Sequence, residues 1–399
     1  MTTTALSLPR IYLQTGRDRR IAHGSPWAYS NEIRMDGAAK GLPPGSLVTV
    51  HRVDGKALGI GMFNPHALIA VRLLDRNPNT VIDAAFLAGR FHLALELRMR
   101  LFADPFYRLV HAEADTLPGL IADRFGNHVV LQVNTAGMAR LTPDILAAVD
   151  DVLAPETVIL RNDSRMRALE GLPNEVTVAR GDAGDPVEVR EGGLSFYAHL
   201  LAGQKTGWFY DQSRSRRFMA PLAAGGTMLD VFCHSGGFAV AAAAAGAVRV
   251  LGIDSSEPAL DLARRAAAAN GVAAICTFRH GEAFASLEAL AATGERFRVV
   301  VADPPAFVKT RRDVNAGLKG YRKLARLAAS VVEPHGFLLV ASCSHSVEPA
   351  MFASEVVAGL DRAGRAGRII RAAGAGPDHP VHPHLPETAY LKTLVIQID

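Results

Sequence analysis

The stretch from residue 227 to residue 254 constrains the fold more than any other part of this 399-residue chain. It reads TMLDV, then a glycine-containing turn and an alanine-rich run, and then VRVLGID. This succession of apolar β-type residues, turn, helix formers and a second apolar run predicts a strand–helix–strand unit. Because strands joined through a helix lie parallel, the unit predicts an α/β sheet that binds ligands at the carboxyl ends of its strands.

The turn inside this unit predicts a nucleoside site. Gly236 and Gly237 would let the backbone approach a ligand, and the following helix offers its N-terminus. Asp254 ends the second strand, where a carboxylate can accept from two ribose hydroxyls. The glycines do not follow the G-x-G-x-x-G pattern, so a dinucleotide is not favoured. The turn instead resembles the nucleoside-binding turn of class I S-adenosylmethionine-dependent methyltransferases.

Later apolar runs also end in residues that can do chemistry. The run 297–302 leads into Asp303, and the run 337–341 leads to Cys343. Strands alternate with helices from residue 227 onward, which predicts a doubly wound sheet in which consecutive strands tend to be neighbours. Asp303 and Cys343 are therefore expected side by side, although alone such a Cys is usually a core residue and an Asp-Pro usually starts a turn. Glu282 follows another such run and is suited to an adenine amino group.

Composition sets the outer limits. With 49% hydrophobic residues, 399 residues can bury large cores, and this length predicts two or three domains. No apolar run approaches a membrane span, and the N-terminus lacks a basic segment followed by an apolar one, so we expect a soluble, cytoplasmic protein with no membrane partner. The three cysteines are too few and too scattered for a disulfide framework or a structural metal site: Cys233, Cys276 and Cys343.

Residues 1–78 are expected to form a small β-barrel or half-barrel, because short β-type runs alternate there with Gly and Pro turns. The expected strands are residues 10–13, 47–53, 57–63 and 68–74. This segment holds ten Lys and Arg against five Asp and Glu, a net charge of +5 in a chain of net charge +4. Such a basic module is typical of contact with a phosphate backbone, with an ordinary solvated surface as the alternative. Trp27 and Tyr29 either stack on bases or belong to the core.

Residues 79–192 predict an α+β domain, and residues 193–399 the α/β domain. Helices are expected at 81–102, 142–153 (capped by Thr142), 257–270, 283–292, 319–332 and 351–362. Strands are expected at 106–112, 119–123, 128–133, 158–160, 175–179, 275–279 and 390–398. The charged residues of NDSRMRALEGL are expected to form surface ion pairs: Asp163, Arg165, Arg167 and Glu170. A loop rich in aromatics and cations is expected before residue 217, either flanking a nucleobase or cofactor or plugging the sheet: Lys205, Trp208, Phe209, Tyr210, Arg214 and Arg216.

Several motifs together carry a family resemblance over nearly the whole chain. They are SPW (25–27), EADTLPGLIADRFG (113–126), SRMRALEGL (164–172), KTGWFYDQ (205–212), LDVFCHSGGFA (229–239), DPPAFVK (303–309), SCS (342–344) and DHP (378–380). The chain resembles the bacterial RlmI-type large-subunit ribosomal RNA methyltransferases. Two positions depart from the family pattern, because Ser213 stands where Arg is frequent and Ala306 stands where Lys is common.

The resemblance implies a PUA RNA-binding domain (1–78), a small α+β domain (79–192) and a class I methyltransferase domain (193–399). It also implies S-adenosyl-L-methionine as cofactor and 23S rRNA, or the assembling large subunit, as partner. The cofactor-binding residues that it implies are Asp211, Gln212, Asp230, Phe232, Ser235, Gly236, Gly237, Phe238, Asp254, Ser255, Glu282, Ala283 and Asp303. The residues that it implies around the target base are Pro304, Pro305, Phe307 and Lys309.

The reaction implied by the resemblance is methyl transfer to carbon 5 of a cytosine. Cys343 would add to carbon 6, because carbon 5 is a poor nucleophile until a thiolate has added, and Asp303 would hydrogen-bond the cytosine edge. His345 is a candidate neighbour of this thiol. Two alternatives remain open: methylation of a guanine nitrogen without a thiol, and a non-catalytic RNA-binding or assembly module. The sequence does not predict the target nucleotide, the proton-abstracting base, the effect of Ser213 or the oligomeric state.

Overall fold

The computed structural model describes residues 8–308 and 310–399, in which the chain divides into two compact units. The first unit contains the chain up to Asp185 and two later segments, Leu200–Thr206 and Asp378–Pro386. The second unit contains Pro186–His199, Gly207–Pro377 and Glu387–Asp399. Each unit therefore includes segments that are far apart in the sequence. In the described part of the chain, no helix is both long enough and apolar enough to cross a bilayer.

A five-stranded sheet forms the N-terminal part of the first unit, in the order β1-β3-β4-β5-β2. Its strands are β1 (Arg10–Tyr12), β2 (Trp27–Tyr29), β3 (Ser46–His51), β4 (Ala57–Phe63) and β5 (Ile69–Asp75). Two single-turn helices accompany them, α1 (Arg19–Ala22) and α2 (Gly37–Lys40). Four strands occupy the predicted runs. The sequence does not predict β2, because three residues are too few for a period-two pattern to show.

A second five-stranded sheet completes the first unit, in the order β10-β9-β8-β7-β6. Its strands are β6 (Phe106–His111), β7 (Leu120–Phe125), β8 (His128–Val133), β9 (Thr157–Asn162) and β10 (Glu175–Arg180). Its helices are α3 (Ala84–Leu101), α4 (Ala136–Arg140), α5 (Thr142–Leu153) and α6 (Arg165–Leu169). The prediction that Thr142 caps α5 is wrong: its hydroxyl donates to the Ala139 carbonyl at 2.9 Å, and Leu141 occupies the cap position.

The expectation of surface ion pairs in the 163–170 segment is also wrong for two of its members. Arg167 is 2% exposed and Glu170 is 7% exposed. The Glu170 carboxylate accepts from Arg72 at 2.6 Å and from the Asn64 amide at 2.9 Å, so it joins the two sheets of the first unit. Charged side chains are buried only when they are paired in this way, and the pairing partners lie about a hundred residues away in the sequence.

The second unit is a seven-stranded sheet in the order β15-β14-β13-β16-β17-β19-β18, with a separate hairpin. The hairpin strands are β11 (Val187–Glu191) and β12 (Leu194–Ala198). The sheet strands are β13 (Thr227–Val231), β14 (Arg249–Asp254), β15 (Cys276–His280), β16 (Phe297–Ala302), β17 (Val332–Ser342), β18 (Gly367–Ala373) and β19 (Lys392–Ile398). The first five of these in the order are parallel, whereas β19 is antiparallel to both of its neighbours.

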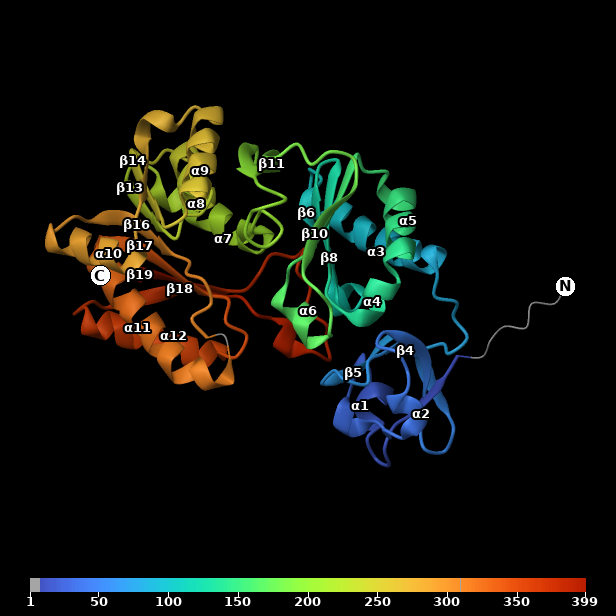
Figure 1. The fold of residues 1–399 in the computed structure, drawn as a ribbon. Coiled ribbons are helices and arrows are strands. Elements are labelled where there is room, and N and C mark those ends of the chain that lie inside the picture. Colours follow the sequence, from blue (N-terminus) through green and yellow to red (C-terminus); the bar gives the residue numbers. More distant parts are fainter. Residues whose placement is uncertain (1–7, 309) are drawn as a thin grey trace. The chain divides into compact units, whose positions relative to one another are not determined.

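Helices cover both faces of this sheet, with α8 and α9 on one side and α11 and α12 on the other (Figure 1). The helices of the unit are α7 (Ser213–Met219), α8 (Gly237–Ala244), α9 (Glu257–Ala269), α10 (Ala283–Ala292), α11 (Val314–Ser330) and α12 (Pro349–Arg362). The prediction of a doubly wound α/β sheet is therefore confirmed. The sequence did not predict β11, α7 or β18, and α11 begins five residues before the expected Lys319.

Candidate active site

The turn after β13 is held in an unusual backbone conformation by the end of β14. Phe232 has φ 65° and His234 has φ 48°, backbone angles that residues other than glycine rarely adopt. One carboxylate oxygen of Asp254 accepts from the His234 amide at 2.8 Å, and the other accepts from the Ser256 amide at 2.9 Å. Asp254 thus fixes the turn, and its remaining lone pairs stay available to a ligand's hydroxyl groups.

The two glycines of this turn are required by packing. Gly236 has φ +80°, and a Cβ there would lie 2.9 Å from the Cβ of Ala263 on α9. A Cβ on Gly237 would lie 2.9 Å from the Cδ of Arg216. The space that the glycines leave open is therefore filled by protein atoms, which gives them a structural role beside the ligand approach expected from the sequence.

Two buried acceptors beside this turn have no partner in the described part of the chain. Asp230 is 1% exposed, and one of its oxygens accepts from the Ala239 amide at 3.0 Å while Oδ1 accepts nothing. Gln212 is 2% exposed; its Nε2 donates to Asp303 at 2.9 Å while its Oε1 accepts nothing. A buried unsatisfied acceptor costs about 1–3 kcal/mol, so the site is built for a ligand that brings donors or positive charge.

The charge of Asp230 points to the same kind of ligand. Burial, reinforced by the nearby Asp303 and Asp254 carboxylates, raises the pKa of Asp230 well above its ordinary value of 3.8. A cation would relieve both effects. S-adenosylmethionine fits these residues chemically, because it carries an ammonium, a sulfonium, ribose hydroxyls and an adenine amino group.

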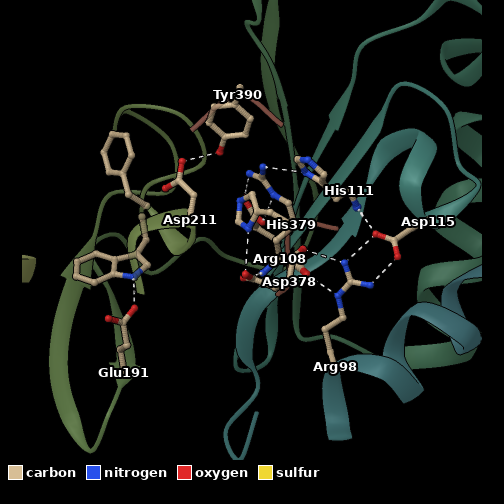
Figure 2. Close-up of polar contacts among 12 residues, drawn as sticks. Arg98, Arg108, His111, Asp115, Glu191, Asp211, Asp378, His379 and Tyr390 are labelled. Carbon is tan, nitrogen blue, oxygen red and sulfur yellow. Dashed lines mark hydrogen bonds and ion pairs between the residues drawn. The ribbon is translucent and has the colours of Figure 1, made fainter. Parts of the chain in front are cut away.

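The predicted cofactor residues lie mainly along the carboxyl edge of the sheet. In strand order they are Glu282 and Ala283 after β15, Asp254 and Ser255 at the end of β14, Asp230 in β13, Phe232, Ser235 and Gly236 in the turn after β13, Gly237 and Phe238 at the start of α8, and Asp303 after β16. Glu282 and Ser255 are exposed. Asp211 and Gln212 come instead from the single turn Tyr210–Gln212 that precedes α7, and the Tyr390 hydroxyl donates to Asp211 at 2.5 Å (Figure 2).

Asp303 and Cys343 follow neighbouring parallel strands, as the sequence predicts. Ala302 of β16 pairs with Val340 of β17, so β17 continues for two residues beyond its partner. Cys343 therefore lies about 7 Å further along the strand direction than Asp303 and about 5 Å to its side, measured between backbone positions. Cys343 is half-buried.

A hydrogen-bonded staple, made of Tyr321 and Ser344, joins the loops that follow these two strands. The Ser344 hydroxyl lies 2.8 Å from the Tyr321 hydroxyl and accepts from the Val308 amide at 3.2 Å. The sequence motifs do not reveal Tyr321. The sequence feature that points to this contact is the glycine pair Gly317 and Gly320 within α11. A Cβ at either position would come within about 3.0 Å of Phe307, so the two glycines mark where this helix packs against the loop after β16.

The residues expected around the target base are partly engaged already. The Phe307 ring packs against Tyr321, at 4.8 Å between centroids, and lies 6.0 Å from Phe284. Pro304 is buried and Pro305 is exposed. Lys309 lies outside the described residues.

The aromatic and cationic segment before residue 217 is largely core. Trp208, Tyr210 and Arg216 are at most 4% exposed, and α7 replaces part of the predicted loop, which was wrong. Arg216 lies over the Trp208 ring at 4.6 Å, and both side chains bond Glu191 of the hairpin. Burial alone would lower the pKa of Arg216, but the Glu191 carboxylate raises it overall. The segment therefore supports the glycine turn from behind.

The other two cysteines lack the surroundings of a nucleophile. Cys233 is 5% exposed, and burial together with Asp230 and Asp254 raises the pKa of its thiol well above 9.0. Burial raises the pKa of Cys276 to about 11. Among residues 8–308 and 310–399, no group of three or more His, Cys, Asp or Glu side chains is arranged to hold a metal ion.

The comparisons with known proteins agree with this geometry. A family model described as S-adenosylmethionine-dependent methyltransferase matches residues 168–395, and a PUA-like domain model matches residues 11–76. Ribosomal RNA large subunit methyltransferase I of Aeromonas hydrophila is 33% identical over 97% of this chain and 98% of its own. The protein of that name from Pseudoalteromonas atlantica is 31% identical over 98% and 99%.

A solved structure confirms the fold. A protein from Streptococcus mutans, described as a candidate S-adenosylmethionine-dependent methyltransferase, superimposes with a TM-score of 0.82 at 18% identity and covers 98% of this chain and 100% of its own. The methyl donor of such enzymes is S-adenosylmethionine, which suits the orphaned acceptors beside β13. This chain belongs to the S-adenosylmethionine-dependent methyltransferase family that includes the ribosomal RNA large subunit methyltransferases I.

Proposed function

We propose that this protein methylates carbon 5 of a cytosine in large-subunit ribosomal RNA through a covalent adduct with Cys343. Its full-length relatives carry the name of large-subunit RNA methyltransferases, and a PUA-like domain precedes the catalytic unit. The observation that carries the proposal is the placement of a thiol and a carboxylate, Cys343 and Asp303, on neighbouring strand ends. Both follow strands at the edge that presents the unsatisfied Asp230 acceptor.

In the proposed reaction the Cys343 thiolate forms a bond to carbon 6, and the electron pair of the carbon 5–carbon 6 double bond moves to carbon 5. S-adenosylmethionine, held by residues such as Asp230 and Asp254, would supply the methyl group as an electrophile: the carbon 5–methyl bond would form as the methyl–sulfonium bond breaks, with that electron pair kept by the cofactor's sulfur. A base then takes the proton from carbon 5, the electron pair of the carbon 5–hydrogen bond restores the carbon 5–carbon 6 double bond, and the Cys343 thiolate departs with the electrons of the sulfur–carbon bond. Asp303, steadied by the Gln212 amide, accepts from the exocyclic amino group of the base.

Cys343 is the thiol best suited to this role. Cys233 is almost fully buried, and its pKa is raised by burial and two carboxylates. Cys276 has a pKa of about 11, so it is almost entirely protonated at neutral pH.

The decisive test is methyl transfer by Cys343→Ala to large-subunit RNA, with tritiated S-adenosylmethionine as donor and Cys276→Ala as matched control. We expect the first variant to lose about a thousandfold or more in rate and the control to stay near the wild-type rate. Calorimetry should show unchanged S-adenosylmethionine binding in both. Mass-spectrometric mapping of the methylated nucleotide should place the mark on cytosine carbon 5.

Two other outcomes would replace the proposal. Activity that persists in Cys343→Ala, with the mark on a guanine nitrogen, would show a mechanism without a thiol. Binding of S-adenosylmethionine that does not differ between wild type and Asp254→Ala would indicate a non-catalytic RNA-binding module.

A further inference from the structure

A buried lysine from the last strand lies beside the proposed nucleophile. Lys392 opens β19 and pairs in register with Ser342, the residue before Cys343. Only 7% of its surface is exposed. Its ammonium donates to the Ser344 carbonyl at 2.6 Å and to the Tyr390 carbonyl at 2.7 Å. Lys392 therefore hydrogen-bonds the backbone of the residue directly after Cys343.

The charge of this lysine lacks an ordinary partner. A buried Lys is normally paired with a carboxylate, yet Lys392 forms no ion pair in the described part of the chain. The two carbonyl groups take two of its three N–H donors, which leaves one for a further acceptor. Burial lowers the pKa of Lys392, while a charged Cys343 and Glu348 act in the opposite direction. A thiolate at position 343 would supply the missing negative charge.

We propose that Lys392 is a positioning residue that keeps Cys343 in its thiolate form by placing a buried positive charge beside it and by fixing residues 342–344. The inference rests on the proposed function, because it assigns Lys392 a role through the Cys343 nucleophile. Electrostatic coupling is reciprocal: if the thiolate favours the charged ammonium, the ammonium favours the thiolate to the same degree. Thiolates next to lysines have lowered pKa values for this reason.

Other titratable groups also face this pair, and the test must separate their effects. Tyr321 of α11 bonds the Ser344 hydroxyl, and burial raises its pKa. His345 is exposed and packs against the Tyr390 ring at 5.3 Å. Glu348 lies before α12, and Asp303 ends the neighbouring strand. Of these groups, the two acids disfavour a thiolate by charge repulsion, so the lysine must act against them.

The pH dependence of Cys343 alkylation by iodoacetamide measures thiolate formation directly. Peptide mass spectrometry isolates the signal of Cys343 from that of the other two thiols. We expect Lys392→Met and Lys392→Gln to raise the alkylation midpoint by about one pH unit or more, and Lys392→Arg to restore most of the wild-type value. Lys319→Met, on the exposed face of α11, is the matched control and should not shift the midpoint.

A second measurement does not depend on whether the lysine variants fold. In Cys343→Ser the Lys392 ammonium loses its proposed partner, so its pKa, followed by 15N NMR of the side chain, should fall below the wild-type value. An unchanged alkylation midpoint in folded Lys392→Gln, or identical Lys392 titration with and without the thiol, would overturn the inference. Neither readout needs RNA. If Cys343→Ala retains methyl transfer while the Lys392 variants still shift the alkylation midpoint of Cys343, the proposed function is wrong but the electrostatic coupling between Lys392 and Cys343 is supported.

Discussion

At the scale of single residues, the site is held under electrostatic stress that a ligand can relieve. Asp230 is buried next to two further carboxylates, and its Oδ1 atom bonds nothing in the described part of the chain. Burying a carboxylate in such a place destabilises the folded state and so lowers the free energy of unfolding. Proteins keep costly groups of this kind where they bind or react, so the stability lost at Asp230 is expected to return as affinity for a cationic cofactor.

We predict that Asp230→Asn stabilises the ligand-free protein at pH 7 by on the order of 1 kcal/mol and weakens S-adenosylmethionine binding at least about tenfold. Asn keeps the acceptor for the Ala239 amide and removes the charge. Because the folded pKa of Asp230 is raised, the wild type loses stability as pH rises above about 4, where the unfolded carboxyl ionises. The difference between the two proteins should therefore vanish near pH 4 and grow with pH.

Thermal unfolding from pH 4 to pH 8 and calorimetric titration provide the measurements. Asp361→Asn, an exposed acid on α12, is the control and should change neither quantity. A variant that is less stable than the wild type at pH 7 would contradict the account of Asp230 as a stressed carboxylate.

At the scale of elements, the loops after β16 and β17 behave as one piece because Tyr321 and Ser344 tie them together. The Ser344 hydroxyl bonds the Tyr321 hydroxyl and the Val308 amide, and both contacts are buried. These loops carry Asp303 and Cys343, which in the proposed mechanism must both reach one base, so the mechanism depends on the relative position of the loops. Misplacement of reacting groups by about 1 Å can cost a hundredfold in rate.

We predict that Ser344→Ala lowers the rate of methyl transfer roughly tenfold to a hundredfold and leaves the affinity for S-adenosylmethionine unchanged. The variant leaves the Val308 amide without its acceptor but does not alter Gln212, Asp230 or Asp254. Hydrogen exchange should accelerate at residues 306–308. Ser330→Ala is the matched control, because it also removes a hydrogen-bonded serine hydroxyl, which here donates to the Leu327 carbonyl at 2.7 Å. Equal rates for the two variants would show that the staple does not position the loops.

Sequence patterns predict the elements of this protein better than the contacts between them. The parallel strands β13 to β17 and the adjacency of Asp303 and Cys343 follow from apolar runs and the neighbour rule for doubly wound sheets. The edge strand β18 is not predicted, because its residues are mostly exposed and show no apolar run. The roles of Tyr321 and Lys392 are not predicted for another reason. Their side chains reach the site from α11 and β19, and sequence alone does not give side-chain directions.

At the scale of the whole molecule, several of the positive charges of the N-terminal segment already bond to other groups of the protein. Arg72 is 9% exposed and bonds Glu170, and the Arg76 guanidinium donates to the Ile21 carbonyl. Arg20 and Arg52 pair with Glu32 and Asp18. Part of the +5 surplus is therefore structural, and the remaining exposed cations must supply any contact with RNA phosphates.

The segment Asp378–Pro386 reaches far back along the chain to complete the first unit. Arg98 is 0% exposed; it forms a two-pronged pair with Asp115, at 2.6 and 2.8 Å, and also donates to the Asp378 carbonyl at 2.9 Å (Figure 2). The Asp378 carboxylate accepts from the Arg108 amide at 3.0 Å and lies 3.0 Å from the His379 ring nitrogen. The DHP motif thus closes a buried polar network on β6.

We predict that Asp378→Ala lowers the free energy of unfolding of the first unit by about 1–3 kcal/mol, because it leaves the buried Arg108 amide without an acceptor. Urea titration followed by hydrogen exchange at β6 and α3 should show an earlier transition there, with the second unit little changed. Asp151→Ala, an exposed acid on α5 of the same unit, is the control and should unfold like the wild type. If both variants share one midpoint, the DHP segment only rests on the first unit and its polar contacts add no stability. If Asp378→Ala alone shifts, residues nearly three hundred positions apart fold as one cooperative unit.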